Sequence, residues 1–323
     1  MTRREALRKL LTLPPAVATC AQISCGPEIP TIFYPKAVGT NGETFGYRKW
    51  ISPKTDPDVV IIGIHGFCGA SIDYTNLGKH LLRHQPETAL YAYELRGQGS
   101  DPIHERRGDI GRPDEWYTDL FAFTGMVRKQ HPNAQIIWFG ESMGALIAAH
   151  AWRAAPSGSS PCDGIALSSP IVRFRDDIPD WTPSLVKAAA TTLPVARVSL
   201  TTLSSGQNLQ MTETSQHGDQ VKTNPYHVEQ HTLRLIGTLT QLIDGMNDCA
   251  ASFQKPVLVL HGGKDFLNTD PDVRGFVARI PQGTPSTYHN YPGSHHLLMY
   301  DRQRNRVFRD IARWIERLRN RDL

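Results

Sequence analysis

The feature that most constrains the fold is a set of short apolar runs rich in β-branched residues. Val59–Ile64 is a continuous run of this kind, and it stops at His65-Gly66. Such runs are typical of strands that are buried on both faces of a parallel sheet. Similar runs occur at 89–93, 135–139 and 256–260, with a weaker one at 164–167. Together they predict a buried, mostly parallel sheet.

Segments with helical periodicity separate these runs. They lie at 74–82, 116–129, 145–154 and 273–280. Because strand and helix alternate along the chain, the sequence predicts an α/β fold with a doubly wound, mostly parallel sheet. Residues 26–57, which hold glycine, proline and weak alternation, are expected to form edge strands or a hairpin before the first buried strand.

The alternation stops between residues 173 and 250. This stretch has no clear buried strand, several polar Ser, Thr and Gln segments, and helical patterns at 184–191 and 228–243. A segment of this length is unusual for a loop in a compact sheet and often forms a lid. We therefore expect 173–250 to be a mainly helical cap inserted into a core made of 26–172 and 251–323.

Residues 1–25 are expected to be an export signal. Four basic side chains and Glu5 give the first nine residues a charge of +3, out of a formal net charge of +4 for the whole chain. The segment 2–8 resembles a twin-arginine export signal, and 17–20 resembles a bacterial lipoprotein box with Cys20 as the lipidated residue. These features predict a periplasmic protein or a membrane-anchored lipoprotein. The alternative is an amphipathic N-terminal helix of a cytoplasmic protein.

Composition excludes several classes of protein. With 323 residues, of which 40% are hydrophobic and 20% charged, the chain can bury a large core, which excludes disordered and collagen-like proteins. No run of 18 residues is apolar without a charge or a breaker, so we expect no transmembrane helix after the signal. Beyond the N-terminus the net charge is only about +1, and we expect no nucleic-acid partner. The arginines at 302–321 alternate with apolar residues at helical spacing and are interpreted as a solvated helix face.

The cysteines predict neither a metal site nor a disulfide framework. None of the five forms a C-x-x-C pair, and no histidine or acidic cluster has zinc-binding spacing. We expect Cys68, Cys162 and Cys249 to be buried thiols.

A nucleophilic serine is predicted at Ser142. The motif Gly-Glu-Ser-Met-Gly at 140–144 follows the predicted strand 135–139 and precedes small apolar residues at 145–149. In this context G-x-S-x-G forms a sharp strand-to-helix turn that projects the serine hydroxyl above the sheet. The glycines avoid collisions at the turn, and the helix N-terminus favours developing negative charge.

A nucleophilic serine needs a base and an acid, which this architecture places on loops after later strands. Asp265 lies just past the strand predicted at 256–260 and is the candidate acid. Asp270 and Asp272 are better explained as helix-capping residues, because Pro271 lies between them at the start of a helical pattern.

The candidate base lies on the loop after the final strand. His295 and His296 are adjacent there, and the residue pattern alone leaves both open. His289, inside the strand itself, is interpreted as structural. Two backbone N–H groups are expected to form the oxyanion hole, those of Met143 and Phe67, which follow the serine and the first buried strand. The alternative for Phe67 is a plain glycine turn at 65–69.

These residues together resemble the α/β-hydrolase superfamily, and within it the monoacylglycerol lipase and lysophospholipase-like branch. The resemblance spans 55–318. It is carried by His-Gly-Phe at 65–67, by Glu-Leu-Arg-Gly-Gln-Gly-Ser at 94–100, which is similar to D-x-R-G-H-G-x-S, by the motif at 140–144 and by Gly262-x-x-Asp265. The closing G-x-x-H of the branch aligns Gly293 with His296, which favours His296 over His295.

The sequence departs from this branch at two positions. Glu94 replaces the usual Asp, and Gln98 replaces the usual His. We interpret this loop as structural, with Arg96 tying it to backbone carbonyls.

The resemblance implies a serine hydrolase that cleaves carboxylic esters through an acyl-enzyme. Ser142 would be the nucleophile, His296 the base and Asp265 the acid, with Phe67 and Met143 at the oxyanion hole and no cofactor. The expected partner is a small-molecule ester or a lipid with one acyl chain. Association with a membrane surface would follow from such a substrate or from a lipid on Cys20.

Three other functions are possible for a chain with these residues: two that use the same triad and one without catalysis. A peptidase of the proline-aminopeptidase type would need an acidic clamp for a free amine, and the cap offers Asp176, Asp177, Asp180 and Glu213. An acyltransferase would share the acyl-enzyme, and a non-catalytic receptor would keep only the pocket.

Apolar residues of the cap have two interpretations. One group either lines an acyl pocket or forms the core of the cap; it comprises Ile178, Trp181, Leu185, Val186, Leu193 and Val195. A second group is expected to pack the second cap helix and comprises Leu233, Leu235, Ile236, Leu239, Leu242 and Ile243.

Overall fold

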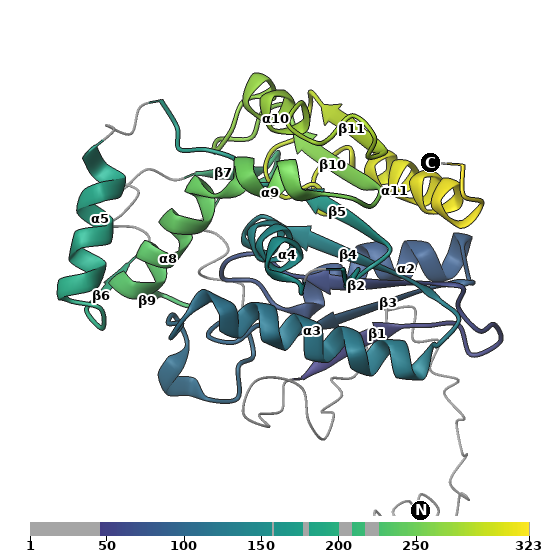
Figure 1. Ribbon diagram of the computed structural model, residues 1–323, viewed down its shortest axis with the longest axis horizontal. Helices are drawn as coiled ribbons and strands as arrows, with labels where there is room; N and C mark the ends of the chain where they lie inside the picture. Colours follow the sequence, from purple (N-terminus) through teal and green to yellow (C-terminus); the bar gives the residue numbers. More distant parts are fainter. Residues whose placement is uncertain (1–45, 157, 177–180, 200–208, 217–225, 323) are drawn as a thin grey trace, which may run out of the picture.

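The computed structural model describes residues 46–156, 158–176, 181–199, 209–216 and 226–322 (Figure 1). The predicted export signal at 1–25, including Cys20, lies outside these residues. At the centre is a seven-stranded sheet of order β1-β3-β2-β4-β5-β10-β11, in which only the β1–β3 pair is antiparallel. Its strands are β1 (Tyr47–Trp50), β2 (Val59–Ile64), β3 (Thr88–Tyr93), β4 (Gln135–Glu141), β5 (Gly164–Ser168), β10 (Val257–Gly262) and β11 (Ser286–Tyr291). This is the predicted doubly wound α/β architecture, and it is an α/β-hydrolase fold.

Helices cover both faces of the sheet. Alternate residues of β2 point to opposite faces, so that Val60 and Ile62 join one core cluster and Val59 and Ile61 join the other. On one face lie α2 (Thr75–His84), α11 (Arg304–Arg319) and the short 3-10 helix η2 (Ser71–Tyr74). The other face is covered by α3 (Pro113–Gln130), α4 (Met143–Ala154), α9 (Met246–Ser252) and α10 (Asp270–Val277).

Local sequence signals account for several helix positions. In α11 the apolar residues at helical spacing are buried, and most of the arginines between them are exposed, as predicted. The α10 helix begins after Thr269, whose hydroxyl accepts the N–H of Asp272, while the Asp272 carboxylate accepts the N–H of Thr269 at 2.8 Å. Asp272 therefore closes a capping box, in agreement with its predicted capping role. Cys162 and Cys249 are buried thiols, and Cys68 is buried as well.

The stretch 173–250 holds more strands than expected. Among the residues of this stretch that the structure describes there are four short strands: β6 (Arg197–Ser199), β7 (Gln210–Thr212), β8 (Ser215–Gln216) and β9 (Gln230–Thr232). They pair as β6–β9 and β7–β8, both antiparallel. The helix predicted from 228 begins only at Leu233, as α8 (Leu233–Asp244), because Thr232 caps it by accepting the N–H of Leu235 at 3.1 Å. Residues Gln230–Thr232 form the strand β9 instead.

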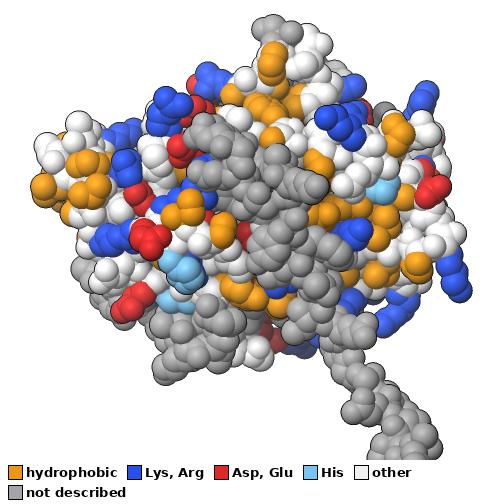
Figure 2. Space-filling view, turned by 90° about the horizontal axis from the view of Figure 1, so that it is seen from below, with side chains coloured by type: hydrophobic (Ala, Val, Ile, Leu, Met, Phe, Trp, Pro, Cys, Tyr) orange, Lys and Arg blue, Asp and Glu red, His pale blue; other side chains and the backbone are white. Residues whose placement is uncertain are grey.

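The helix α5 (Trp181–Thr192) packs beside α8, and both extend away from the central sheet (Figure 1). The packing expected for the second helix is present, since Leu235 and Leu242 are buried in the core. Neither interpretation of the first apolar group holds for Trp181, Leu185, Leu193 and Val195, which are 58–70% exposed. Figure 2 shows hydrophobic side chains gathered at the end of the molecule where α5 lies in Figure 1. Ile178 lies outside the described residues, and no helix within them is both long and apolar enough to cross a bilayer.

Candidate active site

Ser142 occupies a strained turn between β4 and α4. Its backbone has φ 53° and ψ −116°, a conformation that residues other than glycine rarely adopt. The turn is held because the Ser142 N–H donates to the carbonyl of Ser168 on the neighbouring strand at 2.9 Å. The turn also needs its glycines, because a Cβ on Gly144 would lie 1.8 Å from the carbonyl oxygen of Ile64. The predicted strand-to-helix elbow is therefore present.

The structure brings Ser142, His296 and Asp265 into one hydrogen-bonded relay. Nε2 of His296 lies 2.8 Å from Oγ of Ser142, and Nδ1 lies 2.8 Å from Oδ2 of Asp265. Because an ionised carboxylate can only accept, Nδ1 carries the proton, and Nε2 is then the acceptor for the serine hydroxyl. Asp265 is in turn oriented by the N–H of Leu267, which donates to its Oδ1 at 2.9 Å. The arrangement can remove a proton from the hydroxyl of Ser142.

The surroundings of His296 favour its protonated form. Burial disfavours an imidazolium, but the charge and hydrogen bond of Asp265 outweigh it and raise the pKa of His296 above 6.5. A base with this environment stabilises the positive charge that it acquires on taking a proton.

The adjacent histidine has a different partner. Nδ1 of His295 lies 3.1 Å from Oδ2 of Asp301, and the same oxygen accepts the His295 N–H at 2.5 Å. His295 therefore fixes the loop, while His296 contacts the serine. His289 lies within β11, and its ring centroid is 6.3 Å from that of Tyr291.

The segment 65–71, termed the oxyanion loop below, lies against Ser142. A Cβ on Gly66 would be 3.3 Å from the Cβ of Ser142, so the loop backbone passes directly beside the serine. Cys68 adopts a positive φ of 56°, and the N–H of Gly69 closes a turn on the carbonyl of Gly66 at 3.1 Å. Within the described part of the chain, the N–H groups of Phe67 and Met143 donate to no other group. Both remain available for an oxyanion.

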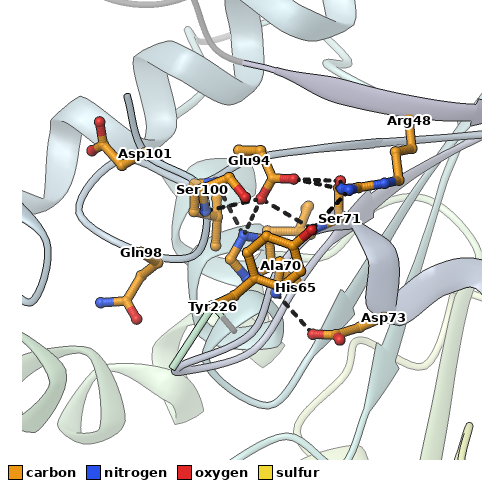
Figure 3. A network of polar contacts seen from close by, with 12 residues as sticks. Arg48, His65, Ala70, Ser71, Asp73, Glu94, Gln98, Ser100, Asp101 and Tyr226 are labelled. Atoms are coloured by element: carbon orange, nitrogen blue, oxygen red, sulfur yellow. Dashed lines mark hydrogen bonds and ion pairs between the residues drawn. The ribbon is translucent and has the colours of Figure 1, made fainter. Parts of the chain in front are cut away.

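A buried ion pair holds the end of the oxyanion loop in place, as Figure 3 shows. Arg48 of β1 contacts Glu94, with 2.9 Å between Nη1 and Oε1, and both side chains are almost fully buried. The hydroxyl of Ser71 donates to the same carboxylate at 2.5 Å, and the N–H of Ser71 donates to its other oxygen at 3.2 Å. The end of the loop is thereby tied to β1 and to the segment after β3.

Two further contacts tie the loop to the segment that follows β3. The N–H of Leu95 donates to Nε2 of His65 at 3.1 Å, so the proton of this ring sits on Nδ1, which faces the carbonyl of Gly66 at 3.0 Å. Burial lowers the pKa of His65, which keeps the ring neutral. Oε1 of Gln98 accepts the N–H of Cys68 at 3.0 Å.

The residues at 94–98 therefore have structural contacts to the oxyanion loop, whereas the sequence analysis predicted a structural role for this segment without naming that loop. Arg96, however, forms a two-pronged ion pair with Asp119, with both nitrogen–oxygen distances 2.9 Å, a partner that the sequence analysis did not identify. Sequence reasoning also missed Arg48 and Ser71, which lie 46 and 23 positions before Glu94. The only signal for them in the sequence was Glu94 itself, which replaces the usual Asp of the resembled branch and whose carboxylate needs a partner when buried.

A second carboxyl group lies next to the serine. Glu141 is buried, and burial, with the nearby charge of Asp73, raises its pKa to about 8. Burial likewise raises the pKa of Asp73 to about 7. Glu141 is therefore mainly neutral at neutral pH.

Comparisons with known proteins identify the family of the chain. Residues 55–303 match the family described as serine aminopeptidase, S33. A monoacylglycerol lipase from Mycolicibacterium smegmatis is 24% identical over 281 residues, which cover 86% of this chain and 94% of that protein.

Solved structures share the fold. A soluble variant of monoglyceride lipase from Saccharomyces cerevisiae, in complex with a substrate analog, aligns with a TM-score of 0.74 at 18% identity, over 90% of this chain and 96% of that one. The monoacylglycerol lipase of Paleococcus ferrophilus aligns with a TM-score of 0.66 at 19% identity, over 85% and 98% of the two chains. The chain therefore has an α/β-hydrolase fold and belongs to the serine aminopeptidase S33 family.

Proposed function

We propose that this protein is a serine hydrolase that cleaves carboxylic esters of lipids with a single acyl chain, with monoacylglycerol as the favoured substrate. One observation carries the proposal. Ser142, His296 and Asp265 come from three separate loops and meet in two hydrogen bonds of 2.8 Å. A strained backbone at Ser142 supports the same role, because such strain is maintained at functional sites by the surrounding structure.

The geometry supports a two-step reaction. Oγ of Ser142 attacks the ester carbonyl carbon while Nε2 of His296 takes the hydroxyl proton. The tetrahedral oxyanion then collapses, the bond to the alcohol oxygen breaks, and His296 returns the proton to that oxygen. Water next attacks the acyl-enzyme and gives its proton to His296. Collapse of the second intermediate releases the fatty acid and restores the hydroxyl of Ser142.

The oxyanion is assigned to two backbone donors. The N–H group of Phe67 lies on the oxyanion loop, which passes beside Ser142, and that of Met143 lies at the first residue of α4. The N-terminus of α4 adds its partial positive charge. Loss of one such donor typically raises the barrier by about 3 kcal/mol.

A lipid substrate is supported by two observations. The relatives and solved structures with the matching fold include lipases that act on monoacylglycerol by name. The exposed apolar side chains of α5 would also lie favourably against a lipid surface. Export directed by residues 1–25 and a lipid on Cys20 belong to the same proposal. Cell fractionation tests them, and Cys20→Ala should release the protein from the membrane fraction.

The peptidase alternative receives less support. Two of its candidate clamp residues already have basic partners: Asp176 pairs with Arg173, and Glu213 pairs with Arg302 at 3.0 Å. The other two, Asp177 and Asp180, lie outside the described residues. A receptor without turnover has no need for the intact relay, and no observation favours acyl transfer over hydrolysis.

The test is hydrolysis of p-nitrophenyl esters from acetate to palmitate, of a monoacylglycerol and of an amino-acid amide. The parent, Ser142→Ala and the control Ser159→Ala, an exposed serine, are compared. We expect ester turnover and fluorophosphonate labelling in the parent and in Ser159→Ala, and neither in Ser142→Ala. Faster turnover of longer chains and cleavage of monoacylglycerol are expected as well. Cleavage of the amide alone would overturn the proposal in favour of a peptidase, and no turnover would favour a receptor.

A further inference from the structure

The segment Tyr226–His231, termed the cap strand segment below, runs along the oxyanion loop. Its middle and one end contact the oxyanion loop, and its other end contacts the buried Arg48–Glu94 ion pair that holds the loop. At the middle, the carbonyl of Val228 accepts from the thiol of Cys68, with 3.5 Å between sulfur and oxygen. Val228 and Cys68 are both buried, so this contact is sealed from solvent.

At one end of this segment, His231 of β9 packs onto the loop. Its ring centroid is 4.2 Å from that of Phe67, and its Nε2 lies 3.6 Å from Sγ of Cys68. His231 is fully buried. One side chain of the cap strand segment therefore contacts both Phe67, the residue assigned to the oxyanion hole, and the residue that follows it with a positive φ.

At the other end, Tyr226 reaches the buried ion pair. Its hydroxyl oxygen accepts from Nη2 of Arg48 at 3.2 Å, and the guanidinium lies 5.8 Å from the centre of its ring. Figure 3 shows Tyr226 beside Arg48, Ser71 and Glu94. Because Arg48 and Glu94 also hold Ser71, the contact extends to the far end of the oxyanion loop.

We propose that the cap strand segment positions the oxyanion loop through His231 and Tyr226, so that seating of this segment aligns the Phe67 N–H with the oxyanion. The inference rests on the proposed function and adds two positioning residues to it. The contacts of His231 are with Phe67 and Cys68 of the loop, and those of Tyr226 are with Arg48 of its support. Their loss should therefore lower transition-state stabilisation and leave substrate binding unchanged.

The experiment compares His231→Ala, His231→Phe and Tyr226→Phe with the parent and with Gln241→Ala, an exposed residue of α8 that serves as the matched control. His231→Phe keeps a ring against Phe67, and Tyr226→Phe removes one hydroxyl only. We measure kcat and KM for p-nitrophenyl acetate, a substrate too small to need an acyl pocket. We also measure inhibition by a trifluoromethyl ketone, whose adduct with serine carries an oxyanion. Circular dichroism checks folding.

We expect His231→Ala to lower kcat roughly tenfold, less than the loss of a whole oxyanion donor, with KM unchanged. The inhibition constant of the ketone should rise by the same factor. Tyr226→Phe should show a smaller loss of the same kind, and His231→Phe should recover most of the activity.

Two outcomes would overturn the inference. One is kcat in His231→Ala and Tyr226→Phe equal to that of Gln241→Ala, and the other is a change confined to KM. If His231→Ala does not fold, Tyr226→Phe decides by the same criteria. An inactive parent, in contrast, refutes the proposed function itself, which the Ser142→Ala comparison detects separately.

Discussion

Replacing Asp265 by asparagine tests the relay sharply, because it removes a charge and changes a hydrogen-bond donor pattern at nearly constant size. Oδ1 of Asp265 accepts the N–H of Leu267, and Oδ2 faces Nδ1 of His296. The single carbonyl oxygen of asparagine would be taken by the Leu267 N–H. Its NH₂ group would then face Nδ1 and place the imidazole proton on Nε2, so that His296 donates to Ser142 and can no longer accept its proton.

The magnitude follows from the burial and spacing of the pair. Both side chains are only 2% exposed, and the carboxylate oxygen is 2.8 Å from Nδ1. When His296 becomes an imidazolium, opposite charges about 4 Å apart at an effective dielectric constant of about 20 attract by about 4 kcal/mol. At about 1.4 kcal/mol for each tenfold change in rate, the loss corresponds to about a thousandfold in kcat/KM.

The assay is kcat/KM for a p-nitrophenyl ester, with Asp265→Ala and Asp270→Asn measured in parallel. Asp265→Asn should be at least as inactive as Asp265→Ala, because alanine does not impose the wrong tautomer. Asp270→Asn should remain close to the parent, since Asp270 contacts Tyr288 and Arg274 and not the relay. The reasoning would be refuted by Asp265→Asn retaining a tenth of the parent's activity or by Asp270→Asn losing as much.

Three further predictions concern pH and buried charge. The acidic limb of the kcat/KM profile should have its midpoint above pH 6.5, because the pKa of His296 is raised, and Asp265→Asn should move that limb to lower pH, where burial acts unopposed. Asp119→Ala should cost about 3–5 kcal/mol in urea unfolding, because it leaves Arg96 buried without this carboxylate; a cost below about 1 kcal/mol would count against this. The pKa of Glu141 is about 8 in the folded protein, whereas its ordinary value is 4.5. The contribution of Glu141 to the free energy of unfolding is therefore fully present below pH 4.5 and is lost as the pH rises toward 8. Glu141→Gln should therefore gain stability relative to the parent across that window, and thermal unfolding at several pH values checks the sign.

The sequence predicted those parts of the fold that follow from long, locally readable patterns. Each run such as Val59–Ile64 is apolar on both faces because its strand is buried on both faces. Ser142 and Asp265 were identified because their roles require a fixed position relative to such a strand. The choice of His296 over His295 rested on a resemblance; in the structure His296 contacts Ser142, whereas His295 contacts Asp301.

Other parts depend on contacts between residues far apart in the chain. The strands β6 to β9 have two or three residues each, too few for alternation to be recognisable. The sequence around α5 holds no pattern that distinguishes apolar residues on an exposed surface from apolar residues that line a pocket. The Arg48–Glu94 pair joins β1 to the residue that follows β3, two segments that are adjacent only in the folded sheet, so its geometry became visible only with the register of β1 against β3.

The relay also links activity to the order in which the chain is made. Ser142 and His296 are separated by 154 positions, and the loop carrying His296 follows β11, the edge strand that pairs with β10. During synthesis, a chain that has emerged through α4 holds the serine but has neither its base nor the strand that places it. Labelling of Ser142 by a fluorophosphonate should therefore begin only when the fold is complete. A ribosome-bound chain that stops before β11 should not be labelled.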